Sequence, residues 1–205
     1  MSIYNLTLVG ETGSKVLINP RYAWVMSFQN SKNIKIDNVI IGHSVGGYCQ
    51  GGVLSFVNSE DIEINNSVLF GCGTTGLQID KVDHLRFLNS TIKDCTYNLL
   101  GIFNSTNICF EKSTFENTGK FNLIYISDFT YNVKFSNCII RNNWNVNYEP
   151  YLIEIGEETA NISLIGSKII DNKTKKFINQ IDRLTMADNT FLYNSFSDFL
   201  VEYKN

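Results

Sequence analysis

Apolar and polar residues alternate in short runs along almost the whole chain. A clear example is residues 84–95, HLRFLNSTIKDC, in which Leu85 and Phe87 are apolar and the residues beside them are mostly polar. Because successive side chains of a strand point to opposite faces, such a run predicts a strand with one buried face. The pattern therefore predicts an all-β protein.

The same pattern recurs at a nearly regular spacing. Further copies begin at Asn33, Asp61, Asn107, Asn132, Asn161 and Arg183, with spacings of 28, 23, 23, 25, 29 and 22 residues, and a partial copy begins at Asn5. A period of 20–50 residues is typical of a solenoid, with the length variation in its turns. A short apolar run precedes each copy and another follows its turn. Three strands per period predict a parallel β-helix of about eight coils of three short strands, forming one domain over residues 1–205.

The turn residues form columns along the predicted solenoid. Between the second and third strands, one column holds Asn38, Asn66, Asn89, Lys112, Asn137, Gly166 and Asp188. The next position is small, with Ser67, Ser90, Ser113, Cys138 and Ser167, and a second polar column holds Ser44, Cys72, Cys95, Thr118, Asn143, Asn172 and Asn194. Because Asn tolerates a left-handed backbone and its amide can bond to the next coil, these columns are expected to stack.

The cysteines follow from the same register. Cys72, Cys95 and Cys138 are expected to point inward as small buried residues, with a Cys72–Cys95 bridge between stacked coils as the alternative. Cys109 and Cys49 are the candidate exposed thiols. The odd number of five cysteines, without a CxxC spacing, gives no zinc site or complete disulfide framework. Together with the lack of a secretory signal pattern, it favours a cytoplasmic location.

The repeated N-I-x-I-x-N-S-x-I coils and the Gly-Cys-Gly-Thr turn at 71–74 resemble bacterial right-handed parallel β-helix repeat proteins of the pectin-lyase-like superfamily. The resemblance covers nearly the whole chain and implies a single-stranded right-handed solenoid in a bacterial or phage setting. That fold carries polysaccharide lyases, glycoside hydrolases, tailspikes and many binding proteins, so the resemblance implies architecture more than activity.

Asp80 and Glu154 are the candidate acids if the chain is a polysaccharide lyase or hydrolase. The outward row of the first strands is expected to hold Ser27, Ser55, Gln78, Gly101, Tyr125, Glu154 and Gln180 or residues near them. Glycoside hydrolysis needs two carboxyl groups about 5–10 Å apart, and these two acids fall on different coils. The motifs that the resemblance would imply for polygalacturonases and pectate lyases are missing. Ile-Gly-His-Ser at 41–44 has the Gly-His pair of one polygalacturonase motif without the acids that would use it. Neither a metal site nor a cofactor is expected.

One edge of the solenoid is the first candidate binding site. Its turns bring together Arg21, Tyr22, Trp24, His43, Tyr48 and Cys49. Tyr and Trp would stack on a sugar or a partner, and Arg21 or His43 would fix polar groups. Alternatively the aromatic residues only cover the apolar flank and His43 is a solvated turn residue, while a Cys49–His43 nucleophile pair lacks a third group. His84, at a repeat start otherwise taken by Asn or Asp, is expected to be structural.

The long turn RNNWNVNYEPYL at 141–152 is the second candidate site. Trp144, Tyr148 and Tyr151 form either a contact surface or a packed loop. A formal net charge of −3, without a basic run longer than KTKK at 173–176, gives no signature for nucleic acid or for a membrane surface. No capping helix is expected at either end, which favours a protein partner or a homo-oligomer through uncapped ends, and membership of a larger protein. The sequence therefore favours a non-catalytic rigid binding module, with glycan recognition included, and leaves a structural spacer as a further alternative.

Overall fold

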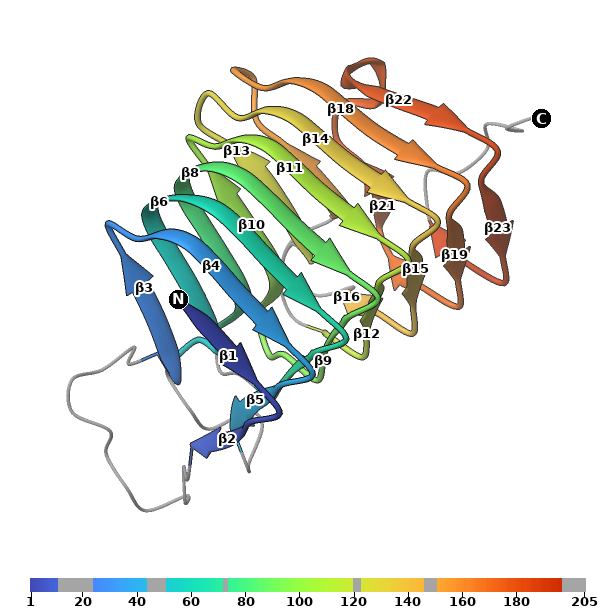
Figure 1. Ribbon diagram of the computed structural model, residues 1–205. Coiled ribbons are helices and arrows are strands. Elements are labelled where there is room, and N and C mark those ends of the chain that lie inside the picture. Colours follow the sequence, from blue (N-terminus) through green and yellow to red (C-terminus); the bar gives the residue numbers. More distant parts are fainter. Residues whose placement is uncertain (11–23, 44–50, 72–73, 120–122, 146–150, 197–205) are drawn as a thin grey trace.

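The chain winds into a solenoid whose coils stack along one axis (Figure 1). The computed structural model describes all residues except 11–23, 44–50, 72–73, 120–122, 146–150 and 197–205. Strands of neighbouring coils pair in parallel in each sheet. The sheet of third strands contains eight strands. The predicted all-β fold, a parallel β-helix, is confirmed.

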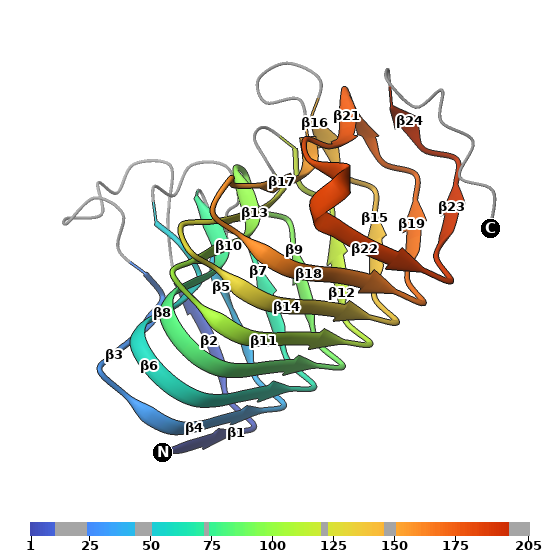
Figure 2. The ribbon, with the colours of Figure 1, turned by 90° about the horizontal axis from the view of Figure 1, so that it is seen from above.

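First and second strands belong to one sheet of 13 strands. The separate first strands are β3 (Met26–Gln29), β10 (Asn98–Phe103), β13 (Ile124–Ser127), β17 (Tyr151–Ile155) and β21 (Lys176–Ile178). The separate second strands are β1 (Ser2–Tyr4), β4 (Lys32–Asp37), β11 (Thr106–Glu111), β14 (Tyr131–Ser136), β18 (Ala160–Ile165) and β22 (Leu184–Ala187). In two coils they are joined, because β6 (Leu54–Asn65) and β8 (Thr75–Leu88) keep pairing through the bend (Figure 2).

The third strands form the eight-stranded sheet. They are β2 (Thr7–Gly10), β5 (Ile40–His43), β7 (Val68–Phe70), β9 (Thr91–Lys93), β12 (Thr114–Glu116), β15 (Ile139–Arg141), β19 (Lys168–Ile170) and β23 (Thr190–Leu192). A small sheet that the sequence pattern did not predict follows in the later coils, with β16 (Trp144–Asn145), β20 (Lys173–Thr174) and β24 (Ser195–Phe196). A short 3₁₀ helix, η1 (Ile181–Arg183), precedes β22.

The core is a stack of inward-pointing side chains. Phe110 and Phe135 lie on successive coils with their rings stacked, 4.8 Å between centroids, and Phe115 meets Phe110 edge-on at 5.6 Å. All three are at most 1% exposed. Full burial of an aromatic or aliphatic side chain contributes about 1.5–3 kcal/mol, so repetition of these contacts from coil to coil holds the stack together.

The turn column from Asn38 to Asp188 adopts the predicted left-handed backbone. All of its seven members have φ between 48° and 61°, including Lys112. Asn38 donates its amide to the side chain of Asn5 (2.6 Å), whereas Asn66 and Asn89 donate to the preceding coil's Asp37 and Asn65, 3.0 Å each. The column is therefore confirmed, although some of its amides bond to the residue before the equivalent position.

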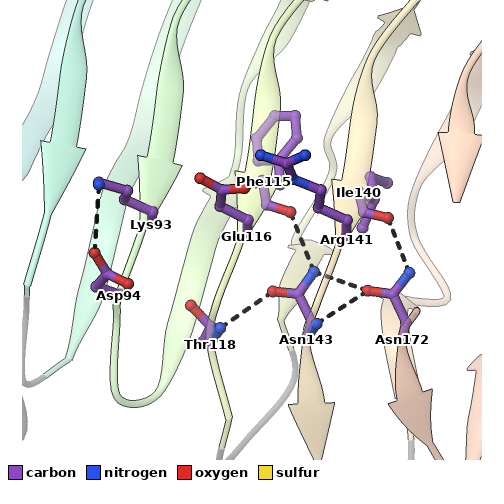
Figure 3. Close-up of polar contacts among 9 residues, drawn as sticks. All are labelled: Lys93, Asp94, Phe115, Glu116, Thr118, Ile140, Arg141, Asn143 and Asn172. Atoms are coloured by element: carbon purple, nitrogen blue, oxygen red, sulfur yellow. Dashed lines mark hydrogen bonds and ion pairs between the residues drawn. The ribbon is translucent and has the colours of Figure 1, made fainter. Parts of the chain in front are cut away.

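Buried polar side chains form ladders at the inner corners. Ser67 accepts from the backbone N–H of Val39, and Ser90 accepts from that of Ser67 (2.9 Å). In the second column the ladder runs from Cys95 through Thr118, Asn143 and Asn172 to Asn194, and the backbone N–H of each of the first four donates to the side chain one coil further on. Figure 3 shows its central part. Each ladder satisfies backbone donors that the corner removes from the sheets.

A third ladder was not predicted from the sequence. It lies between the first and second strands, where backbone N–H groups donate to hydroxyl oxygens one coil further on: Ser31 N–H to Ser59 Oγ, Val82 N–H to Ser105 Oγ, and Ser105 N–H to Thr130 Oγ1. The sequence carries the signal as a small residue after each Asn or Asn equivalent, but Val82 interrupts it.

The described cysteines are free thiols. Cys95 and Cys138 are buried as expected, and burial raises the pKa of Cys138 to about 11. Because Cys95 is free, the alternative of a Cys72–Cys95 bridge is wrong, and Cys95 instead contacts the carbonyl of Lys93 through Sγ (3.4 Å). Cys109 points outward but is only half-exposed, and this burial raises its pKa. Cys49 and Cys72 lie outside the described residues.

Candidate functional site

The outward row of the first strands lies in the predicted register. Ser27 pairs with Ser55, then Gln78, Gly101, Tyr125 and Glu154 follow on successive coils. Gln180 is not part of the row, because β21 ends at Ile178. Ser27 is exposed and Ser55 is only 2% exposed. On the following coils, Gln78, Tyr125 and Glu154 are partly exposed and Gly101 is buried.

An aromatic pair lies on this outer face. Phe103 and Tyr125 meet edge to face with 5.5 Å between ring centroids, and both are half-exposed. Phe103 lies two residues after Gly101 on the same face of β10, and a Cβ at Gly101 would lie only 2.9 Å from the Phe103 ring. Gly101 therefore lets the Phe103 ring fold down along the sheet.

Polar side chains surround this pair. Gln78 pairs with Gly101, Asp80 pairs with Phe103, and Glu154 pairs with Tyr125 on the other side. Asp80 accepts a hydrogen bond from Asn104 Nδ2 at 3.3 Å. These partly exposed residues, Gln78, Asp80, Phe103, Tyr125 and Glu154, are referred to below as the Phe103–Tyr125 patch. The sequence reasoning missed Phe103, although its position two residues beyond Gly101 signals the same face.

The two candidate acids are too far apart to act as a glycosidase pair. Asp80 lies on β8 and Glu154 on β17, with β10 and β13 between them. Three interstrand steps of about 4.8 Å give a separation of about 14 Å along the solenoid. Retaining and inverting glycosidases need roughly 5–10 Å between their carboxyl groups.

Trp24 and His43 meet at Gly52. The Trp24 ring packs against Gly52, where a Cβ would clash with it, and His43 Nε2 lies 3.2 Å from the Gly52 carbonyl oxygen. His43 is only 4% exposed, so it is not a solvated turn residue, because β5 carries it onto the same inward face as Ile41. Trp24, half-buried, covers the stack. Arg21, Tyr22, Tyr48 and Cys49 lie outside the described residues.

Trp144 is a prominent exposed aromatic residue of the second candidate site. It is 56% exposed on β16, and its partner on the next coil is Lys173. Tyr151 begins β17, pairs with Lys176 and is half-exposed. Tyr148 lies outside the described residues. His84 lies within β8 at a left-handed position (φ 59°), like Asn107 and Asn132 at the equivalent positions, and it contacts Asp83 through Nδ1 at 2.9 Å. This agrees with the expected structural role.

The described residues show neither a metal-binding cluster nor a membrane-spanning helix. They contain no group of three or more His, Cys, Asp or Glu side chains arranged to hold a metal ion. Within the same part of the chain, no helix has the length and hydropathy needed to cross a bilayer.

Comparisons with known proteins agree on the architecture. A family model described as right handed beta helix region matches residues 25–196. A search of curated proteins gives no match. The solved structure of the surface protein and adhesin PfbA of Streptococcus pneumoniae is similar with a TM-score of 0.59 and 12% identity, over 95% of this chain and 66% of that one.

Two further solved structures are more distant. A glycoside hydrolase has a TM-score of 0.37 and 10% identity, over 87% of this chain and 42% of its own. The tailspike protein gp49 from Pseudomonas phage LKA1 has a TM-score of 0.33 and 11% identity, over 96% of this chain and 46% of its own. This chain thus spans less than two thirds of each of the three structures, and identities this low show the fold alone.

Proposed function

The chain belongs to the right-handed β-helix family, and we propose that it is a non-catalytic binding module that holds a glycan on the Phe103–Tyr125 patch. The observation that carries the proposal is the aromatic pair on the rigid outer face of the first strands. Aromatic rings present a flat apolar surface at low entropic cost, which suits the apolar face of a sugar ring.

The residues around the rings supply the polar contacts that a sugar needs. Gln78 offers a donor and an acceptor through its amide, and Asp80 and Glu154 offer carboxylate acceptors for hydroxyl groups. A binding site with a few polar groups around an apolar centre is the usual arrangement for small ligands. Because the side chains stand on paired strands, their spacing is fixed before the ligand arrives, which lowers the ordering cost of binding.

A binding role also agrees with the arrangement of acids. The separation of Asp80 and Glu154 across three strand steps does not suit the two-carboxylate chemistry that hydrolysis would require. The similar structure from Streptococcus pneumoniae is described as a surface protein and adhesin, which is a binding role for that protein. The proposal for this chain rests on its own patch.

The test is retention of the protein in native gels that contain a panel of neutral and acidic polysaccharides. If the proposal holds, at least one polysaccharide retards the protein, and Tyr125→Ala and Phe103→Ala weaken this binding by about tenfold or more, since loss of an aromatic contact costs about 1.4 kcal/mol or more. Tyr131→Ala is the matched control, because Tyr131 is exposed on β14 outside the patch. Its binding should equal that of the unchanged protein.

Three results would overturn the proposal. The first is retention that survives both patch variants. The second is release of reducing ends from a polysaccharide, abolished by Asp80→Asn or Glu154→Gln, which would make the chain a polysaccharide-active enzyme. The third is a protein that binds none of the glycans and in which Phe103→Ala, Tyr125→Ala, Asp80→Asn and Glu154→Gln change no measured property. Such a protein would be a spacer or would bind a protein partner.

A further inference from the structure

Three neighbouring turns form an acidic ridge on the later coils. The turn after β13 carries Asp128 and Phe129, the turn after β17 carries Glu157 and Glu158, and η1 carries Ile181 and Asp182. These six residues are all exposed and are called the acidic ridge below. Phe129 is 56% exposed and Ile181 is 40% exposed.

Backbone contacts place these turns side by side. Gly156 N donates to Ile126 O (2.8 Å), and Ala160 N donates to Thr130 O (3.2 Å), so the second turn lies against the first. Arg183 Nη1 donates to the carbonyls of Glu157 and Thr159, which fixes η1 against the second turn. The same three turns are neighbours in Figure 2.

The ridge carries negative charge without matching cations. Among the described residues, the ion pairs join other charges, such as Glu63 with Arg86 and Glu116 with Arg141, and none includes an acid of the ridge. Arg183 is the nearby cation, and its contacts from Nη1 go to backbone carbonyls. The ridge therefore has unneutralised carboxylates beside two exposed apolar side chains.

A surface of opposite charge lies at the other end of the same first strands. Lys173 and Lys175 flank the inward-pointing Thr174, so both point outward, and Lys173 pairs across to the exposed Trp144. Neither lysine joins an ion pair among the described residues. Trp144, Lys173 and Lys175 are called the basic patch below.

We propose that two copies of this chain associate by docking the acidic ridge of one on the basic patch of the other. The lysines would meet the ridge carboxylates, while Trp144 would pack against Phe129 or Ile181, combining an aromatic anchor with complementary charge. Since each copy carries both surfaces, the chain supplies its own partner. The proposed glycan patch is not used by this contact, so the two ideas are tested separately.

The experiment is light scattering over a concentration series, with paired charge reversals. The unchanged protein should show a mass that rises above the 23.3 kDa of one chain. Glu157→Lys with Glu158→Lys, and separately Lys173→Glu with Lys175→Glu, should each weaken association by about tenfold or more, because like charges then face each other. The control is Lys134→Glu with Lys168→Glu, which changes the net charge as much as the Lys173 and Lys175 reversal does but at exposed positions outside both surfaces. This variant should associate like the unchanged protein.

Mixing the two reversed proteins distinguishes docking from misfolding. The lysine-reversed protein keeps the acidic ridge and has lost the basic patch, whereas the glutamate-reversed protein keeps the basic patch and has a ridge in which two lysines lie beside Asp128 and Asp182. Each protein should therefore associate weakly alone, and the mixture, which contains one intact ridge and one intact basic patch, should associate. High salt should weaken both the native and the mixed complexes. A protein that is monomeric at all concentrations, or variants that associate like the unchanged chain, or a mixture that stays monomeric, would overturn the proposal.

Discussion

At the scale of the residue, His43 is a titratable side chain enclosed by the stack. Its Nε2 contacts a carbonyl oxygen, which only accepts, so Nε2 carries the proton and Nδ1 is the bare nitrogen of the neutral ring. Nδ1 has no hydrogen-bond partner in the described part of the chain. Burial lowers the pKa of His43 below its usual 6.5, with the Gly52 carbonyl opposing this more weakly.

We expect His43 to make stability depend on pH. The unfolded chain binds its proton near pH 6.5 whereas the folded chain does so only at lower pH, so stability falls as the pH drops below about 6.5. His43→Gln keeps an amide donor for Gly52 and does not titrate. Urea midpoints measured at pH 7, 6 and 5 should fall less steeply for this variant than for the unchanged protein.

His84→Asn is the control for this prediction. It removes the other histidine of the chain from an exposed left-handed turn that Asn occupies elsewhere, so the pH dependence due to His43 should remain. Identical slopes for the unchanged protein and His43→Gln would contradict the prediction.

The burial or exposure of single side chains was the property that the sequence predicted least well. Alternation alone could have placed His43, since Ile41 two residues earlier is inward, but the neighbouring glycines suggested an exposed loop. Phe103 was missed because its exposure depends on how its ring folds along Gly101, which is a packing result. By contrast, the left-handed turn column was readable, because Asn and Gly are the residues that accept that backbone at low cost.

At the scale of the element, the polar ladders explain why the coils keep their register. Asn143 accepts from Thr118 N–H at 3.2 Å and donates from Nδ2 to Phe115 O at 3.1 Å and to Asn172 Oδ1 at 3.0 Å (Figure 3). It is 1% exposed. One side chain therefore connects three coils at a corner where the sheets are interrupted.

We expect Asn143→Leu to destabilise the fold by about 2–4 kcal/mol, since it leaves the buried N–H of Thr118 and the buried carbonyl of Phe115, both on the preceding coil, without their side-chain partner. The adjacent Asn142 is a matched control, because it is exposed and left-handed (φ 54°), and Asn142→Gly should change the free energy of unfolding by only a few tenths of a kcal/mol. The measurement is urea unfolding at neutral pH. Equal losses in the two variants would show that the ladder adds little.

Strand boundaries were predicted less well than strand positions. The sequence pattern predicts separate first and second strands in every coil. In the structure β6 and β8 continue through the bend, because Ser59 pairs with Val82 and Glu60 pairs with Asp83 there. The small sheet of β16, β20 and β24 was not predicted either, because a two-residue strand such as β16 has too few positions to show a period.

At the scale of the whole molecule, burial changes along the axis. Middle coils contain inward residues such as Phe87 and Ile92 with 0% exposure, whereas Met186, Phe191 and Phe196 of the last described coil are only partly buried. In a solenoid each coil depends on its neighbours, so the last described coil should open more easily.

We therefore expect amide hydrogen exchange to be graded along the solenoid. Peptides covering β8, β11 and β12 should exchange at least about tenfold more slowly than those covering β22, β23 and β24, because a middle coil is paired on both sides. Mass spectrometry of pepsin fragments measures this. A single rate for all fragments would mean that the molecule opens only as one unit.

The turn between β13 and β14 is one residue longer than the equivalent turn of the preceding coil, between β10 and β11. Phe103 pairs with Ser127 before the turn, and Thr106 pairs with Tyr131 after it. The extra length leaves the strands on both sides aligned, and Phe129 with φ 53° is displayed at the surface. A coil can thus gain a residue at a corner without moving any neighbour. For protein engineering, this makes the corner between β13 and β14 an insertion point, at which we expect that a loop of chosen sequence can be grafted while the stack keeps its alignment.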